Sequence, residues 1–183
     1  DFDEENWQAD VAAFCKCCRE IGLTPAVERS RSGNGAHVWL FFSNPVPAAD
    51  ARRLGSGLLT QTMACRHELS FASYDRLFPS QDIIPKGGFG NLIALPFQGQ
   101  AQKNGNSLFV DERLVPYPDQ WAFLSSLPKI SPEQLTECLQ RLCRDGEMGE
   151  LADTAEKQVP WQRKRTRRKL INADFPVQIK LVL

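Results

Sequence analysis

The sequence predicts a mixed α/β (α+β) fold, because helical and strand-like patterns follow one another along the chain. Apolar residues in the window 7–21 recur at intervals of three and four, the spacing of an amphipathic helix. These residues are Trp7, Val11, Phe14, Cys18 and Ile21. A second pattern is an extended segment from Ala26, which runs into a glycine-rich turn and then an apolar run over 37–42. We therefore expect a hairpin-like pair of strands whose tip carries residues 32–36.

Further elements follow in order. The patterning predicts a helix over 48–63 after two prolines, a strand over 92–97, a polar turn over 100–106, a strand over 107–110 and a short capped helix over 117–124. Ser131 heads a last helix, with Pro132 at its first position and Glu133 in its first turn. Apolar density falls beyond residue 145, so we expect one folded domain over 1–144 and a linker with the start of a following region over 145–183.

The composition narrows the possible functions. The 183 residues include 22 basic and 22 acidic side chains, so a nucleic-acid role has to rest on local basic patches. The basic run 163–169 is one such patch, and a solvated linker explains it at least as well. No apolar run approaches the roughly 20 residues of a membrane-spanning helix. No signal peptide is visible and the chain opens without Met, so we expect a piece of a longer protein.

Cys15 and Cys18 are three positions apart, but the six cysteines as a set do not show the spacing of a secreted disulfide scaffold or a zinc ribbon. This spacing favours reduced thiols that act as small apolar residues, and it indicates a cytoplasmic protein. Cys65 and His67 are close enough in sequence to share a metal ion, but no convincing further ligand stands near them.

The central motif is the turn 32–36, which feeds His37 into the following strand. Gly33 and Gly35 let a backbone approach a ligand closely, and exposed N–H groups in such a turn can bind phosphate oxygens. Ser32 and His37 add polar side chains at fixed places. Arg29 and Arg31 stand just before the turn as candidate nucleic-acid contacts. The alternative for His37 is a buried structural histidine.

Carboxylates are the second feature. Asp1 and Asp3 flank Phe2, so in a strand they share one face, where a divalent cation would offset their repulsion. The alternative is a solvated acidic terminus, since two glutamates follow. Asp82 is a third carboxylate, and Lys86 heads a glycine loop as a candidate phosphate cation. That loop is not a P-loop, because its lysine precedes the glycines, and a plain hairpin is the alternative.

Three elements follow one another along the chain: the pair Asp1 and Asp3, the turn with His37, and Asp82 before the glycine loop. In this order they resemble the motifs of the archaeo-eukaryotic primase superfamily. The amino-acid sequence of segments 28–39, 74–82, 85–96 and 116–125 is similar to that of the primase domain of TOTE conflict systems. The resemblance spans about residues 1–144 and implies a primase/polymerase-like catalytic domain there. It implies a primase-type core in which an RRM-like sheet is paired with a smaller αβ unit.

The resemblance also implies roles for single residues. Asp1, Asp3 and Asp82 would hold two divalent ions, Mg²⁺ or Mn²⁺. Ser32 and His37 would contact the triphosphate of a nucleoside triphosphate, with Lys86 as a further cation. The expected partners are a DNA or RNA template and primer, together with helicase and nuclease regions of the same polypeptide, and no membrane.

Two departures from the family pattern stand out. The apolar strand that ends in the first acidic motif is missing, so the α-amino group of Asp1 lies close to the expected metal site, and metal binding by this fragment is expected to be impaired. No zinc-ribbon insertion is recognisable.

The leading hypothesis is a template-directed DNA primase or polymerase. The alternatives are a non-catalytic nucleic-acid-binding domain that positions a helicase, and an α/β domain that binds a small nucleotide for signalling.

Overall fold

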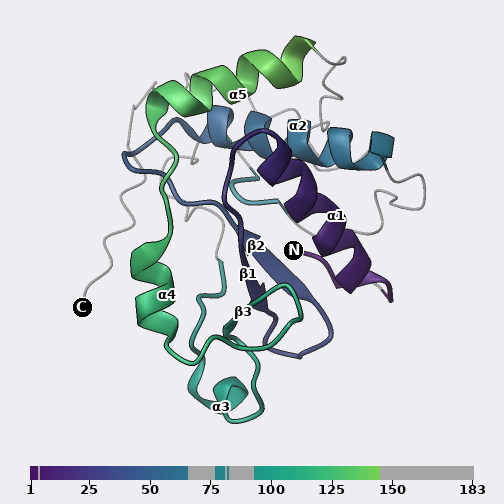
Figure 1. The fold of residues 1–183 in the computed structure, drawn as a ribbon, viewed down its shortest axis with the longest axis vertical. Helices are drawn as coiled ribbons and strands as arrows, with labels where there is room; N and C mark the ends of the chain where they lie inside the picture. The colour runs from purple at the N-terminus through teal and green to yellow at the C-terminus, as the bar shows by residue number, and fades with distance from the viewer. Residues whose placement is uncertain (4, 66–76, 81, 83–92, 145–183) are drawn as a thin grey trace, which may run out of the picture.

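The fold comes from a computed structural model, which describes residues 1–3, 5–65, 77–80, 82 and 93–144. Helices and short strands alternate in the part of the chain so described (Figure 1). The helices are α1 (Trp7–Glu20), α2 (Ala48–Cys65), α3 (Gly99–Gln102), α4 (Gln120–Ser126) and α5 (Pro132–Arg144). The strands are β1 (Ala26–Arg29), β2 (Ala36–Trp39) and β3 (Phe109–Val110). The predicted mixed α/β fold is confirmed.

The sheet is antiparallel, with β1 between β2 and β3. The register places Glu28 opposite His37 on one side and opposite Phe109 on the other. The predicted hairpin is therefore correct, but its second strand is shorter than expected. It ends at Trp39, and Phe42 pairs only in an isolated bridge with Ile130.

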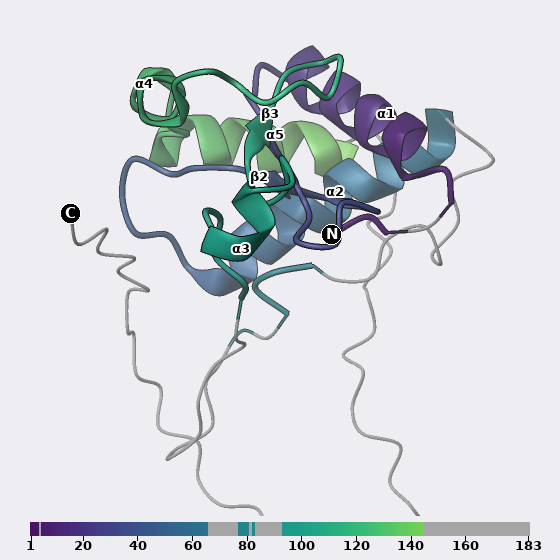
Figure 2. The same ribbon diagram turned by 90° about the horizontal axis from the view of Figure 1, so that it is seen from below.

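The N-terminal residues join the outer edge of β2. The N–H of Phe2 donates to the carbonyl of Ala36 at 2.8 Å, and the N–H of Ala36 donates back to the carbonyl of Phe2 at 2.7 Å. Both views show the chain start next to this strand (Figures 1 and 2). One short bridge thus fixes the acidic N-terminus against the start of β2.

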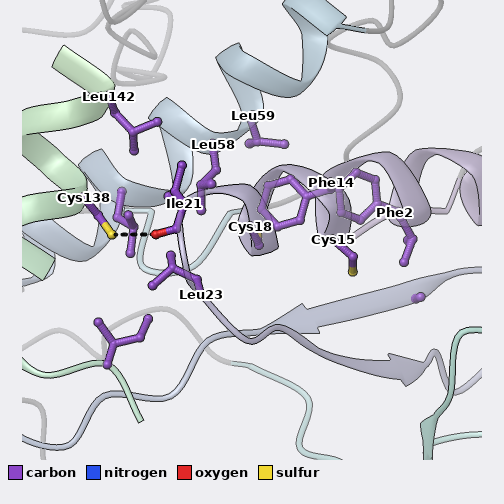
Figure 3. Packing of buried hydrophobic residues seen from close by; sticks show 14 of the residues in the cluster. Phe2, Phe14, Cys15, Cys18, Ile21, Leu23, Leu58, Leu59, Cys138 and Leu142 are labelled. Carbon is purple, nitrogen blue, oxygen red and sulfur yellow. Dashed lines mark hydrogen bonds between the residues drawn. The ribbon is translucent and has the colours of Figure 1, made fainter. Parts of the chain in front are cut away.

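The hydrophobic core lies where α1, α2 and α5 meet the sheet. Helix α2 packs beside α5 and against α1, as Figure 2 also shows. Phe2 and Phe14 lie in this core with their ring centroids 5.7 Å apart, and Sγ of Cys138 donates to the carbonyl of Ile21 (Figure 3). The predicted apolar face of 7–21 is confirmed, since all five of its residues are buried.

Cysteines of helices α1 and α5 contribute small buried side chains. Cys15, Cys17, Cys18 and Cys138 are buried free thiols, and Cys65 is an exposed one. Burial raises the pKa of Cys15 to about 11 and also raises the pKa of Cys18. The four buried cysteines therefore pack as small apolar side chains, as predicted, and Cys65 does not.

The prediction of a strand over 92–97 is wrong, because residues 93–97 form no strand. Pro96 has no N–H to donate to a ladder, and Phe97 adopts a left-handed conformation with φ +67°, which turns the chain. The N–H of Phe97 then donates to the carbonyl of Ser107 at 2.9 Å. Leu92 lies outside the described residues.

The two C-terminal helices follow the capping signals in the sequence. Helix α4 starts three residues later than predicted, because Asp119 is its N-cap and accepts from the N–H groups of Trp121 and Ala122. Helix α5 begins at Pro132 as expected, and the hydroxyl of Ser131 accepts from the N–H of Gln134. Lys86 and the linker over 145–183 lie outside the described residues. Within the described helices, none has the length and apolarity to cross a membrane.

Candidate nucleotide site

The turn between β1 and β2 is closed by short hydrogen bonds. The N–H of Ser30 donates to the carbonyl of Gly35 at 2.9 Å, and the N–H of Gly33 donates to the carbonyl of Ser30 at 3.0 Å. The hydroxyl of Ser32 lies 3.0 Å from that of Ser30 and accepts from the N–H of Asn34 at 3.2 Å. Gly33 has φ +84°, which explains a glycine at that position. The result is a tight turn that exposes Ser32.

The acidic N-terminus lies directly against this turn. A Cβ at Gly35 would come within 2.5 Å of the carbonyl oxygen of Phe2 and 3.0 Å of Cα of Asp3. Phe2 is buried, and because side chains alternate along an extended segment, Asp1 and Asp3 are directed away from the core. Asp3 is exposed and Asp1 is half-buried.

His37 links the turn to the acids. Its Nε2 atom lies 3.3 Å from Oδ1 of Asp1, and its side chain is 23% exposed. The sequence-predicted residues Asp1, Asp3, Gly35 and His37 are therefore brought together at the outer edge of β2.

Glu28 is a site residue that the sequence reasoning did not single out. Its carboxylate is buried and lies 3.1 Å from Nδ1 of His37. Trp39 donates to the same oxygen at 2.8 Å. The available signal was its position, since Ala26 and Glu28 share the buried face of β1 and a carboxylate there needs partners.

The two arginines before the turn differ in their surroundings. Arg29 donates from Nη2 to the carbonyl of Leu114 at 2.9 Å, so its guanidinium is anchored within the fold. Arg31 is exposed, and its carbonyl accepts from the side chain of Asn106 at 3.3 Å. Arg31 is thus the more accessible of the two.

Asp82 has a partner that was not expected. Arg52 of α2 donates from Nε to Oδ1 of Asp82 at 3.0 Å and from Nη2 to Oδ2 at 2.6 Å. The side chain of Arg52 is 25% exposed and that of Asp82 is 39% exposed, and the two form a two-pronged ion pair. The carboxylate of Asp82 is therefore neutralised by a protein cation.

Divalent ions of the magnesium type prefer carboxylate oxygens, and Asp1 and Asp3 supply them on one side of the Phe2 bridge. Within the described residues, no group of three or more His, Cys, Asp or Glu side chains is arranged to hold a metal ion. The donor chemistry of the pair fits a hard cation, and a site that also uses Asp82 requires its release from Arg52.

A small antiparallel sheet backed by helices carries a glycine turn, a histidine and carboxylates at its edge, which is consistent with an α/β domain of the primase type. Residues 1–138 match the family described as the archaeo-eukaryotic primase domain of the TOTE conflict system, and the chain belongs to that family. The resemblance inferred from the sequence is confirmed. Membership indicates a role in nucleotidyl transfer or nucleic-acid handling. A search of curated proteins found no match to this chain.

Proposed function

We propose that this domain is a template-directed nucleotidyltransferase, a DNA primase or polymerase that acts with two divalent ions. The observation that carries the proposal is the contact between the turn and the acidic terminus. Gly35 packs on the backbone of Phe2 and Asp3, and His37 lies 3.3 Å from Asp1. Phosphate-binding groups and metal-binding groups therefore share one edge of the sheet, as joining nucleotides requires.

Each residue has a defined task in this proposal. The ions, Mg²⁺ or Mn²⁺, would be held by Asp1, Asp3 and Asp82, and when bound they would supply charge stabilisation and activation of the attacking 3′-hydroxyl. Ser32 and His37 bind and orient the triphosphate. Gly33 and Gly35 shape the turn that meets the nucleotide, because Gly33 takes a left-handed conformation and Gly35 leaves room for the backbone of Phe2 and Asp3.

Basic residues have further roles in this proposal. Lys86 serves as a further phosphate cation. Arg31, and Arg29 to a lesser degree because of its bond to Leu114, contact the template or primer. The remaining partners are helicase and nuclease regions of the same polypeptide, and the expected location is the cytoplasm.

The test is nucleotide binding and primer extension by the full-length protein with Mn²⁺ or Mg²⁺. We expect calorimetry to show nucleoside triphosphate binding that depends on the metal, and Asp3→Ala to abolish extension while template affinity is retained. Asp50→Ala is the matched control, since Asp50 is an acid in the first turn of α2 that pairs with Arg53. Binding of the triphosphate without any metal dependence would contradict the proposal.

A second candidate is a non-catalytic nucleic-acid-binding domain that positions a neighbouring helicase. The pairing of Asp82 with Arg52 favours it, because that carboxylate already has a cation. Asp82→Ala separates the two candidates. An enzyme loses synthesis and keeps template affinity, whereas a binding module tolerates the change and weakens when the basic run 163–169 is neutralised.

A further inference from the structure

Glu28 is a carboxylate in the middle of the central strand, and its side chain is only 2% exposed. An isolated charge at such depth is strongly unfavourable, so its partners account for its presence. Its described side-chain partners come from two places in the chain, strand β2 and the residue pair before β3. They are His37, Trp39 and Ser107.

The two oxygens of Glu28 have separate tasks. Oε2 receives Nε1 of Trp39 at 2.8 Å and faces Nδ1 of His37 at 3.1 Å. The indole nitrogen can only donate, so Oε2 accepts from Trp39, and an accepting oxygen at this place favours a hydrogen on Nδ1 of His37. With Nδ1 held on the inside, Nε2 is directed outward to Asp1. A carboxylate behind a histidine fixes the orientation of its ring in this manner, and Nε2 donates to a phosphate oxygen when it also carries a hydrogen.

The other oxygen, Oε1, connects the site to a second loop. It accepts from the hydroxyl of Ser107 at 3.2 Å. Ser107 is fully buried and adopts φ +55°, a conformation that non-glycine residues rarely take. Its neighbour Asn106 lies over the nucleotide turn, since a Cβ at Gly33 would be 2.9 Å from the Asn106 side chain. Glu28 therefore ties this loop and His37 to one strand.

We infer that Glu28 is a positioning residue of the nucleotide site, which holds His37 so that Nε2 faces the triphosphate and the acidic terminus. The inference rests on the proposed function, because it takes His37 to be a triphosphate contact. Glu28 itself is buried behind the histidine and touches no substrate.

A double-mutant cycle with Glu28→Gln and His37→Ala tests this role. Gln keeps the size of the side chain, and its NH₂ can donate to the Ser107 oxygen. Its neutral amide oxygen holds His37 by a weaker hydrogen bond than a carboxylate does, so the change loosens the histidine without leaving a cavity. The probe is a nucleoside triphosphate with Mn²⁺, measured by calorimetry on the whole chain. We expect Glu28→Gln to weaken binding by about tenfold when His37 is present, the scale of a hydrogen bond to a charged group.

In the His37→Ala background, Glu28→Gln should change nucleotide affinity by less than about twofold, because the group that it positions is gone. Trp39→Phe is the control, since it removes another donor to Glu28 and leaves the bond to His37. It should lower stability without changing nucleotide affinity. Equal losses from Glu28→Gln in both backgrounds would make Glu28 merely structural and overturn the inference.

The outcomes also separate the two proposals. If His37→Ala weakens nucleotide binding and Glu28→Gln does not, the positioning role fails and the proposed function stands. If His37→Ala itself leaves binding unchanged, the proposed triphosphate contact fails and the positioning role with it.

Nitrogen NMR of the His37 ring in the unmodified chain is a second test, which does not depend on whether a variant folds. A hydrogen on Nδ1 supports the role, and a bare Nδ1 overturns it.

Discussion

Gly35 lies so close to Phe2 that no side chain fits between them: a Cβ at Gly35 would be 2.5 Å from the carbonyl oxygen of Phe2. This approach allows the paired hydrogen bonds between Phe2 and Ala36, at 2.8 and 2.7 Å. It also sets Asp1 beside His37 and Asp3 beside Gly35. The missing side chain of one glycine thus determines whether the acids and the histidine meet.

Gly35→Ala should therefore detach the N-terminus from β2. The obstacle is backbone, which cannot rotate aside as a side chain can. We expect the free energy of unfolding to fall by about 1 to 3 kcal/mol, through lost hydrogen bonds and displaced Phe2, in urea denaturation.

Gly99→Ala is the control for that measurement. Nothing lies within 4 Å of a Cβ at Gly99. Its stability should change by less than about 0.5 kcal/mol. If the two variants were equally stable, the close packing at Gly35 would not hold the N-terminus in place.

The cap of α4 gives a second stability test. Oδ1 of Asp119 accepts from the N–H of Trp121 at 3.1 Å and from the N–H of Ala122 at 2.9 Å. Asp119→Ala leaves both donors without this acceptor and should cost about 1 kcal/mol of stability in thermal or urea unfolding. Asp119→Asn keeps an acceptor oxygen and should restore most of it, and an Asn variant as unstable as the Ala variant would argue against the cap.

Local patterns explain why much of the fold was predictable. The helix over 7–21 follows from apolar spacing because its buried face packs along one continuous core. The capped starts of α4 and α5 follow from Asp119 and from Ser131 with Pro132 in the same way. The strand over 92–97 was wrong because apolar content does not reveal that Phe97 takes a left-handed conformation.

The site was less predictable, because it depends on contacts between distant positions. The glycine turn and His37 were readable as a local motif. The pairing of Asp82 with Arg52 joins residues 30 positions apart, and no spacing rule links them. The role of Glu28 depends on its register with His37 and on a hydroxyl 79 positions away. Such partners become visible only once the chain is folded.

The buried thiol of Cys15 predicts how stability depends on pH. Burial raises the pKa of Cys15 from its ordinary value of 9.0 to about 11. The unfolded chain therefore loses this proton first as pH rises, so the stabilising contribution is complete below pH 9 and is lost as pH rises through 11. The loss should be on the order of 2 kcal/mol.

Urea unfolding of the unmodified chain and of Cys15→Ala between pH 8 and pH 11 checks this. The difference in unfolding free energy between the two proteins should shrink as pH rises, because only one of them carries the thiol. A constant difference over that range would show that Cys15 is not buried as a neutral group in solution.

The ion pair of Arg52 with Asp82 leads to the last prediction, which concerns metal affinity. If Asp82 is a metal ligand, Arg52 competes with the metal for the same two carboxylate oxygens, at 3.0 and 2.6 Å. Arg52→Ala should then raise the affinity for Mn²⁺ by about fivefold, since an ion pair of this exposure is worth about 1 kcal/mol. Arg53→Ala, which removes an exposed neighbour paired with Asp50, should leave Mn²⁺ affinity unchanged.

Calorimetric titration of the unmodified chain and both variants with Mn²⁺ tests this competition between Arg52 and the metal. A weaker affinity in Arg52→Ala would mean that the arginine orients Asp82 for the metal, and an unchanged affinity would mean that Asp82 does not bind it.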